Sequence, residues 1–273
     1  MSDDVSRHYT RGDLDETLLD ALARNGCDTE NLKPEDLAPF DEFHVRGHAA
    51  TSELLDKLEF DTDGHVLDVG SGLGGPSRRL AQMQGCSVTG IDLTLEYCDV
   101  AALFAERVGL ADRVNYQQAN ALSMPFDDGS FDGAITQHVA MNIEERPGLY
   151  TEIARVLKSG AQFGLYDIFQ GQGGDVCYPA PWAETPATSF LVPPDAIAPL
   201  LWDAGFEVIS QRNTTAQGRA WFQAMRAKTE RDGPPPLGIH LLLGPVFKEM
   251  AANMVRNLNE DRVALVEIVC RKR

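Results

Sequence analysis

The stretch VLDVGSGLGGP at residues 66–76 decides the fold of this 273-residue chain. A short apolar run leads into a loop with several glycines, which permit the positive φ angles of a tight strand-to-helix turn and let a ligand approach the backbone. Gly70, Gly72 and Gly75 match the G-x-G-x-x-G pattern of a nucleotide-binding turn. Alone, the pattern fits a dinucleotide dehydrogenase or a plain tight turn equally well.

From Gly64 onward the chain alternates strand-like and helix-like segments, which is typical of a parallel sheet. The expected strands are His65–Val69, Ser87–Asp92, Val114–Gln118, Phe131–Gln137, Gln162–Ile168, Phe206–Gln211 and Val263–Cys270. The expected helices are Pro76–Met83, Leu95–Val108, Pro147–Leu157 and Pro194–Ala204, preceded by Asp13–Asn25 and His48–Leu58. The sequence therefore predicts an α/β fold: a seven-stranded, mostly parallel, Rossmann-like sheet with helices on both faces.

Two segments interrupt this alternation. Residues 169–193 are rich in glycine, proline and aromatics, and residues 228–259 contain a run of three prolines followed by an apolar stretch. We expect both to be insertions that form substrate loops. The predicted organisation is an N-terminal helical lid over residues 1–60 and one catalytic domain over residues 61–273.

The composition indicates which classes of binding partner to expect. The formal net charge is −17, and an acidic chain repels the phosphates of nucleic acids and anionic membrane surfaces. No stretch approaches the roughly 18 consecutive apolar residues of a membrane span, and the polar N-terminus lacks an apolar signal core. We therefore expect a cytoplasmic protein with a small-molecule partner rather than a nucleic acid or a membrane. The sequence does not indicate an oligomeric state.

Three features later in the sequence help to indicate which nucleotide the glycine-rich turn binds. Asp92 closes the second strand, where a carboxylate accepts hydrogen bonds from both ribose hydroxyls. Asn120 and Ala121 follow the third strand, where a side-chain oxygen can accept from an adenine amino group. The segment PFDDGSFD at 125–132 then leads into the fourth strand, and no second βαβαβ half follows, which disfavours a dehydrogenase.

As a set, VLDVGSGLGG at 66–75, TGID at 89–92, NALSMPFDDGSFD at 120–132 and RVLKSG at 155–160 resemble the class I S-adenosylmethionine (SAM)-dependent methyltransferases. The resemblance covers roughly residues 45–210 and implies SAM as cofactor and S-adenosylhomocysteine (SAH) as product. It implies that Asp68 and the loop hold the methionine end, Asp92 the ribose, and Asn120 and Ala121 the adenine. This family usually has Asp where Asn120 stands. The implied cofactor-binding residues are Asp68, Gly70, Ser71, Gly72, Gly74, Asp92, Leu93, Asn120, Ala121 and Gln137.

A narrower resemblance lies in DEFHVRGHAAT at 41–51, TQHVAMNI at 136–143 and YPAPWA at 178–183. These segments are similar to the sarcosine/dimethylglycine N-methyltransferases and border the phosphoethanolamine and tocopherol methyltransferases. The resemblance implies a small amine as acceptor, with an O- or C-methyltransferase acting on a small metabolite as the alternative. Arg46 is the nearest candidate to clamp the carboxylate of an amino-acid acceptor.

His138 is the predicted catalytic residue. It follows the fourth strand, ligands sit beyond the carboxyl ends of such strands, and its ordinary pKa suits proton transfer near neutrality. Met141, Asn142 and Trp182 are the other predicted substrate contacts, and Trp182 could face a cation. Three of these residues also have a purely structural interpretation, which is packing for His138 and Trp182 and loop hydrogen bonding for Asn142.

No metal site is expected, because the i, i+4 pair His44 and His48 lacks further His or Cys ligands. The segment Phe43–Thr51 is instead predicted to cover SAM. The residues alone leave two alternative functions open. One is an NAD(P)-dependent oxidoreductase, a function that does not account for the pattern at residues 120–132. The other is a protein that binds SAM without methyl transfer or uses the fold for another reaction.

Overall fold

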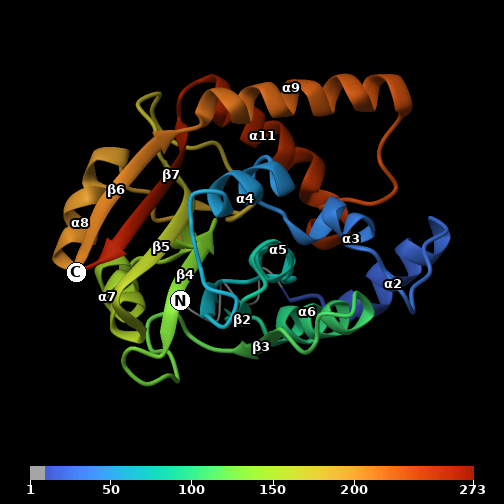
Figure 1. The fold of residues 1–273 in the computed structure, drawn as a ribbon. Coiled ribbons are helices and arrows are strands. Elements are labelled where there is room, and N and C mark those ends of the chain that lie inside the picture. The colour runs from blue at the N-terminus through green and yellow to red at the C-terminus, as the bar shows by residue number, and fades with distance from the viewer. Residues whose placement is uncertain (1–9) are drawn as a thin grey trace.

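The computed structural model describes residues 10–273, in which one seven-stranded sheet runs in the order β3-β2-β1-β4-β5-β7-β6 (Figure 1). Strand β7 is antiparallel to both of its neighbours, and the other pairs are parallel. This confirms the predicted mostly parallel, Rossmann-like sheet. The strands are β1 (His65–Val69), β2 (Ser87–Asp92), β3 (Val114–Gln118), β4 (Phe131–Gln137), β5 (Leu157–Gln170), β6 (Phe206–Asn213) and β7 (Val263–Lys272).

The first four strands have the predicted bounds, whereas the last three are longer. β5 begins at Leu157, which pairs with Phe131 across a register shift, and it continues to Gln170. The extension follows from the antiparallel partner, because β7 pairs with β5 through to Gln170 and with β6 as far as Asn213. Strand β7, which is distant in the sequence, therefore determines where β5 and β6 end.

Helices cover both faces of the sheet (Figure 1). Apolar side chains of α7 (Arg146–Val156) and α8 (Ile197–Asp203) pack on one face. Those of α4 (Gly47–Leu55), α5 (Gly75–Gln84) and α11 (Phe247–Asn259) pack on the other. The predicted helix over 194–204 is a 3-10 turn at Pro194–Ala196 that continues into α8.

The N-terminal helices do not stand apart from the rest of the protein. Leu14, Leu18 and Leu22 of α2 (Leu14–Arg24) share a cluster with Phe104 of α6 (Leu95–Arg107) and with Leu242. Helix α3 (Pro34–Asp41), which the sequence analysis did not predict, contributes to the same cluster. The boundary at residue 60 stays a prediction, and residues 1–9 of the predicted lid lie outside the described part.

The second predicted insertion is helical. Between β6 and β7 the chain forms α9 (Thr215–Asp232), α10 (His240–Leu243), a 3-10 turn at Gly244–Val246, and α11. These helices lie above the end of the sheet beside the N-terminal helices (Figure 1). Across residues 10–273, no helix has both the length and the apolar character needed to span a membrane.

Candidate functional site

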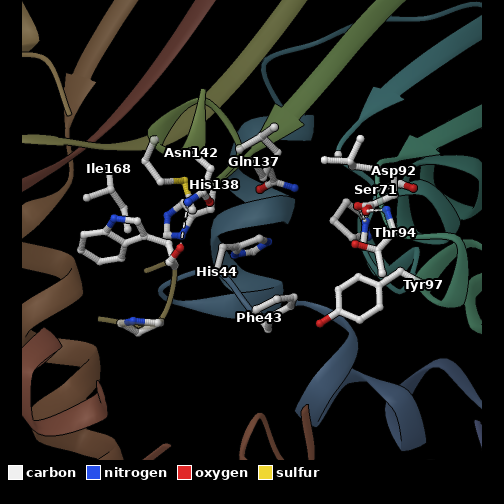
Figure 2. Close-up of a pocket in the computed structure, with 18 of the residues that line it drawn as sticks. Phe43, His44, Ser71, Asp92, Thr94, Tyr97, Gln137, His138, Asn142 and Ile168 are labelled. Carbon is white, nitrogen blue, oxygen red and sulfur yellow. Dashed lines mark hydrogen bonds between the residues drawn. The ribbon is translucent and has the colours of Figure 1, made fainter. Parts of the chain in front are cut away.

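A cavity of about 340 Å³ lies at the carboxyl ends of β1, β2 and β4. One side is formed by the glycine loop after β1 and by the segments after β2 and β3; the other is formed by the loop after β4, Trp182 and helices α9 to α11. Figure 2 shows Asp92, Ser71 and Thr94 on one side, His138 and Asn142 on the other, and His44 between them.

The glycine loop brings bare backbone to the cavity. Gly70 has φ +73, and a Cβ there would lie 2.2 Å from Val139 Cγ2. Gly72 has φ +52, and a Cβ there would meet only Phe43 Cε1, at 3.9 Å. Thus packing requires glycine at 70, whereas position 72 borders open space where a ligand can approach. Between them the Ser71 hydroxyl is buried, with no hydrogen-bond partner among the described residues.

Asp92 is held rigidly at the end of β2. Its Oδ2 accepts from the backbone N–H of Gly72 at 3.0 Å, and its Oδ1 accepts from that of Thr94 at 2.9 Å. Burial raises the pKa of this carboxyl group, and the backbone donors oppose the rise. Since a carboxylate has about four acceptor sites, it retains acceptors for a ligand while its orientation is fixed by the backbone.

The predicted adenine side is a polar loop. Asn120 lines the cavity together with Ala121 and Leu93, and its Oδ1 accepts from the backbone N–H of Leu122 at 2.9 Å. A carbonyl oxygen has two lone pairs, so the prediction that Asn120 also accepts from adenine stands. Tyr97 lines this half as well and was not predicted.

Asp68 and Gly74, implied as cofactor-binding residues, are not among the residues that line the cavity, and their direct contact with SAM stays a prediction. Asp68 is buried and accepts from the Ser77 hydroxyl at 2.5 Å, so it fixes the first turn of α5. Gly74 has φ +79, and a Cβ there would lie 2.3 Å from the hydroxyl of Tyr116. Both residues support the loop from behind.

His138 directly follows β4 and lines the cavity. Its φ is +55, an uncommon conformation for a non-glycine residue, and its backbone N–H donates to the Tyr166 carbonyl at 2.8 Å. Burial, and secondarily His44, lower the pKa of His138 well below its ordinary value. The imidazole is therefore neutral near pH 7 and able to accept a proton or a hydrogen bond.

The other predicted substrate contacts surround His138. Met141 and Trp182 line the cavity, and Trp182 Nε1 donates to Ser189 Oγ at 2.9 Å. Asn142 also lines it, but its amide nitrogen donates to the carbonyls of Trp182 and Thr188, each at 2.8 Å. The amide nitrogen of Asn142 thus ties two loops together, as its structural interpretation predicts, and its contact with the substrate stays a prediction.

The segment before α4 contributes Phe43, His44 and Val45 to the cavity. His44 is buried, and its Nε2 lies 2.9 Å from Thr51 Oγ1. Arg46, predicted as a carboxylate clamp, does not line the cavity; it is buried and forms an ion pair with Glu53, which corrects that prediction.

Sequence reasoning missed the wall formed by the C-terminal helices. Trp221 and Phe222 of α9 and Phe247 and Met254 of α11 line the cavity. For Phe247 and Met254 the only sequence signal was the apolar character of the 228–259 insertion, whereas Trp221 and Phe222 lie before this segment. Because the helices cross over the sheet from a distant part of the chain, spacing within the insertion could not assign them to this cavity.

The residues present fit SAM. At Gly72 a ligand can approach the backbone closely. Asp92 provides acceptors in a fixed orientation. The buried Ser71 hydroxyl, which has no hydrogen-bond partner among the described residues, provides a donor. Such an arrangement suits a nucleoside with a polar tail. The residues that would hold it directly are Gly70, Ser71, Gly72, Asp92, Leu93, Asn120, Ala121 and Gln137, all of which line the cavity.

Comparison with known proteins agrees with this fit. A family model described as a methyltransferase domain matches residues 67–165. The chain is 39% identical over 102 residues to the sterol 24-C-methyltransferase ERG6B of Gibberella zeae, covering 37% of this chain and 27% of that one. It is 32% identical over 176 residues to the O-methyltransferase rstn1 of Aspergillus nomiae, covering 62% and 76%. The chain spans less than two thirds of the first curated relatives, 27% of ERG6B and 64% of an O-methyltransferase of Pyrenophora dematioidea.

Solved structures share the fold. Phosphoethanolamine N-methyltransferase 2 of Haemonchus contortus, in complex with SAM, gives a TM-score of 0.73 at 20% identity, covering 85% of this chain and 54% of that one. The [4+2]-cyclase SpnF gives 0.71 at 24% identity, covering 100% and 97%. A protein of Galdieria sulphuraria described as a sarcosine dimethylglycine methyltransferase gives 0.62 at 17%, covering 82% and 81%. At these identities the likeness concerns the fold alone.

Proposed function

The chain belongs to the class I SAM-dependent methyltransferases that act on small molecules, and we propose that its methyl acceptor is a bulky, largely apolar molecule, methylated on a hydroxyl or an amino group. The name of one relative, the sterol 24-C-methyltransferase ERG6B, supports an acceptor larger than an amino acid, and the name of another, an O-methyltransferase, supports a hydroxyl group as the nucleophile. The observation that carries the proposal is the apolar wall of the acceptor half of the cavity.

That wall combines aromatic and aliphatic side chains from separate elements. Trp182 follows β5, Trp221 and Phe222 come from α9, and Phe247 and Met254 come from α11. Predominantly apolar pockets with a few placed polar groups bind molecules whose surface is also mostly apolar. Among the described residues that line the cavity, none is a Lys or an Arg.

This lining bears on the amine acceptor expected from the sequence. Sarcosine and dimethylglycine carry a carboxylate, and burying a charge without a partner is costly. Arg46, the nearest candidate cation, is paired with Glu53 outside the cavity. We therefore place the amine, if nitrogen is the nucleophile, on a larger apolar molecule; the choice between nitrogen and oxygen stays a prediction.

The residues account for the proposed chemistry. Bound SAM supplies a methyl group already activated by the sulfonium. The apolar wall holds the acceptor in line and excludes water. The neutral imidazole of His138 accepts the hydrogen bond of the acceptor's O–H or N–H and takes up its proton as the new bond forms.

A screen with methyl-labelled SAM tests the proposal. Sarcosine and dimethylglycine are compared with bulky phenols, sterols and apolar amines, and label is expected in a bulky acceptor. Ala251→Phe, which narrows the apolar half, should raise the KM of that acceptor while leaving SAH affinity unchanged. His138→Ala should slow turnover by about 10²–10⁴-fold at unchanged SAH affinity. Label in sarcosine, with every bulky acceptor inert, would reject the proposal.

A further inference from the structure

Glu42 is a buried carboxylate that borders two cavities. It follows α3, is 6% exposed, and lines both the main cavity and a separate hollow of about 20 Å³. His48 and Arg79 also line the hollow, whose volume suffices for about one water molecule. Glu42 thus lies between the ligand cavity and a small site near the surface.

The hydrogen bonds of Glu42 suit either protonation state. Thr51 Oγ1 donates to its Oε2, and His48 Nδ1 lies 3.1 Å from its Oε1. Ionised Glu42 accepts from both partners, whereas protonated Glu42 can donate to a bare Nδ1 of His48. The His48 side chain is 47% exposed, so a proton that leaves Glu42 has a route to solvent.

The charged groups around Glu42 compensate the negative charge of its ionised carboxylate only in part. Burial, and then the charge of Asp41, raise the pKa of Glu42 to about 7. Arg78 lowers it only in part, since its guanidinium pairs with Asp41 at 2.6 Å. Arg79 also lowers it, but its Nη2 donates to Ser52 Oγ at 3.2 Å.

Two neighbouring histidines complete the surroundings. Burial lowers the pKa of His44 to about 4, so His44 is neutral near pH 7 and supplies no cation to Glu42. Burial and Arg79 lower the pKa of His48, and Asp41 and Glu35 oppose the shift. Of the cations near ionised Glu42, Arg78 is shared with Asp41, and Arg79 lines the small hollow rather than the main cavity.

Glu42 lines the main cavity close to the start of α5. A Cβ on Gly75 would lie 2.6 Å from Glu42 Cγ, so the carboxylate side chain packs against the start of α5. Thr51 joins Glu42 to Gln137 at the end of β4, with Gln137 Nε2 at 3.3 Å from Thr51 Oγ1. If Asp92 holds the ribose, as predicted, the amino-acid tail of SAM would extend away from the adenine, toward the start of α5 and Glu42.

We propose that Glu42 binds the α-ammonium group of the methionine tail of SAM and SAH, and that cofactor binding displaces a proton from Glu42 to solvent. The proposal concerns the cofactor, so it holds for any acceptor. Only the ionised carboxylate pairs with the ammonium, so binding favours loss of the Glu42 proton. The one bond that breaks in the protein is the O–H bond of the Glu42 carboxyl group, whose proton passes to His48 Nδ1 and from there to water, while the electron pair stays on the carboxylate.

The coupling has a defined sign. Below pH 7 the ionised fraction of Glu42 falls about tenfold per pH unit, and the apparent affinity of a ligand falls with the fraction of protein competent to bind it. SAH should therefore bind roughly tenfold more weakly at pH 6 than on the plateau above pH 7. Near pH 7, about half a proton should be released for each SAH bound.

Isothermal titration calorimetry with two ligands tests this without any acceptor. SAH carries the ammonium tail, whereas 5′-methylthioadenosine keeps the nucleoside and thioether but lacks the tail. Titrations between pH 6 and 8, in buffers of different ionisation enthalpy, count the protons released. Wild-type protein should release protons with SAH and none from Glu42 with methylthioadenosine, whose affinity should be flat over this range.

Variants assign the effect to the side chain. In Glu42→Gln the amide can still accept from Thr51 and donate to His48, so the fold is retained. This variant should bind SAH about tenfold or more weakly, without proton release, and should bind methylthioadenosine as wild type does. Glu42→Asp should restore part of the proton release, and Asp92→Asn should weaken both ligands alike.

Two results would overturn the proposal. One is Glu42→Gln protein that binds SAH with wild-type affinity and pH dependence. The other is equal proton release with SAH and methylthioadenosine, which would assign the proton to the nucleoside half. Failure of every acceptor in the labelled screen, by contrast, would leave these titrations unaffected, so the two proposals fail separately.

Discussion

The carboxylate of Asp92 offers the sharpest test of how the chain holds its cofactor. Its two oxygens accept from two different backbone donors, the N–H groups of Gly72 and Thr94. In Asp92→Asn only one oxygen remains, so whichever way the amide turns, one backbone N–H faces an NH₂ group. The variant loses the charge that is expected to strengthen the predicted bonds to the ribose hydroxyls, and it should also loosen the loop that borders the cavity.

The expected size follows from these contacts. Hydrogen bonds to charged groups are worth about 1.5–3 kcal/mol, which corresponds to roughly 10–150-fold in Kd for SAH. The unpaired N–H group should cost about 1–3 kcal/mol of stability, visible as a lower Tm. Calorimetry with SAH and methylthioadenosine measures the first effect, and thermal unfolding measures the second.

The matched control is Asp20→Asn, the same chemical change on the exposed face of α2, where Arg24 is the one ion-pair partner of Asp20 within residues 10–273. It should alter neither the SAH affinity nor, by more than about 0.5 kcal/mol, the stability. If Asp92→Asn is folded and binds SAH as tightly as this control, the carboxylate does not hold the ribose and the orientation assigned to the cofactor is wrong.

Three further outcomes are expected. Gly70→Ala should destabilise the fold by about 1–3 kcal/mol in denaturant unfolding, because its φ is +73 and its Cβ would strike Val139; wild-type stability would contradict this. Asn120→Leu should weaken SAH binding while Asn120→Asp preserves it, and equal affinities would exclude contact with the base. Burial raises the pKa of Asp68 to about 7, so its contribution to stability is present below about pH 4 and is lost as pH rises toward 7. Unfolding curves of Asp68→Asn should lack this fall, and an unchanged pH dependence would contradict it.

The sheet and the cofactor half of the cavity were predictable because their determinants are local. Strand β1, its glycine turn and α5 are contiguous, and Asp92 and Asn120 stand at the ends of the next two strands. In a parallel sheet the carboxyl ends of neighbouring strands meet at one edge. Sequence order alone therefore brings these residues together.

The acceptor half was not predictable in the same way. Helices α9 to α11 reach the cavity from between β6 and β7, and no periodicity in their sequence states which strand end they cover. The hydrogen-bond partners of Asn142 could not be assigned for a related reason. Its amide bonds the backbone of residues 182 and 188, so its partners were unknown until the loop after β5 was placed.

This division has a consequence for how the protein selects its acceptor. The predicted cofactor contacts come largely from backbone and short side chains at the strand ends, where Gly70 and Asp92 are fixed by packing and by hydrogen bonds. The apolar wall comes from side chains such as Trp221 and Phe247 on helices outside that framework. Substitutions on α9 and α11 can therefore reshape the acceptor half without moving a cofactor contact, whereas a change in the glycine loop affects every acceptor alike. Acceptor range and SAH affinity should accordingly vary independently across variants of these two helices.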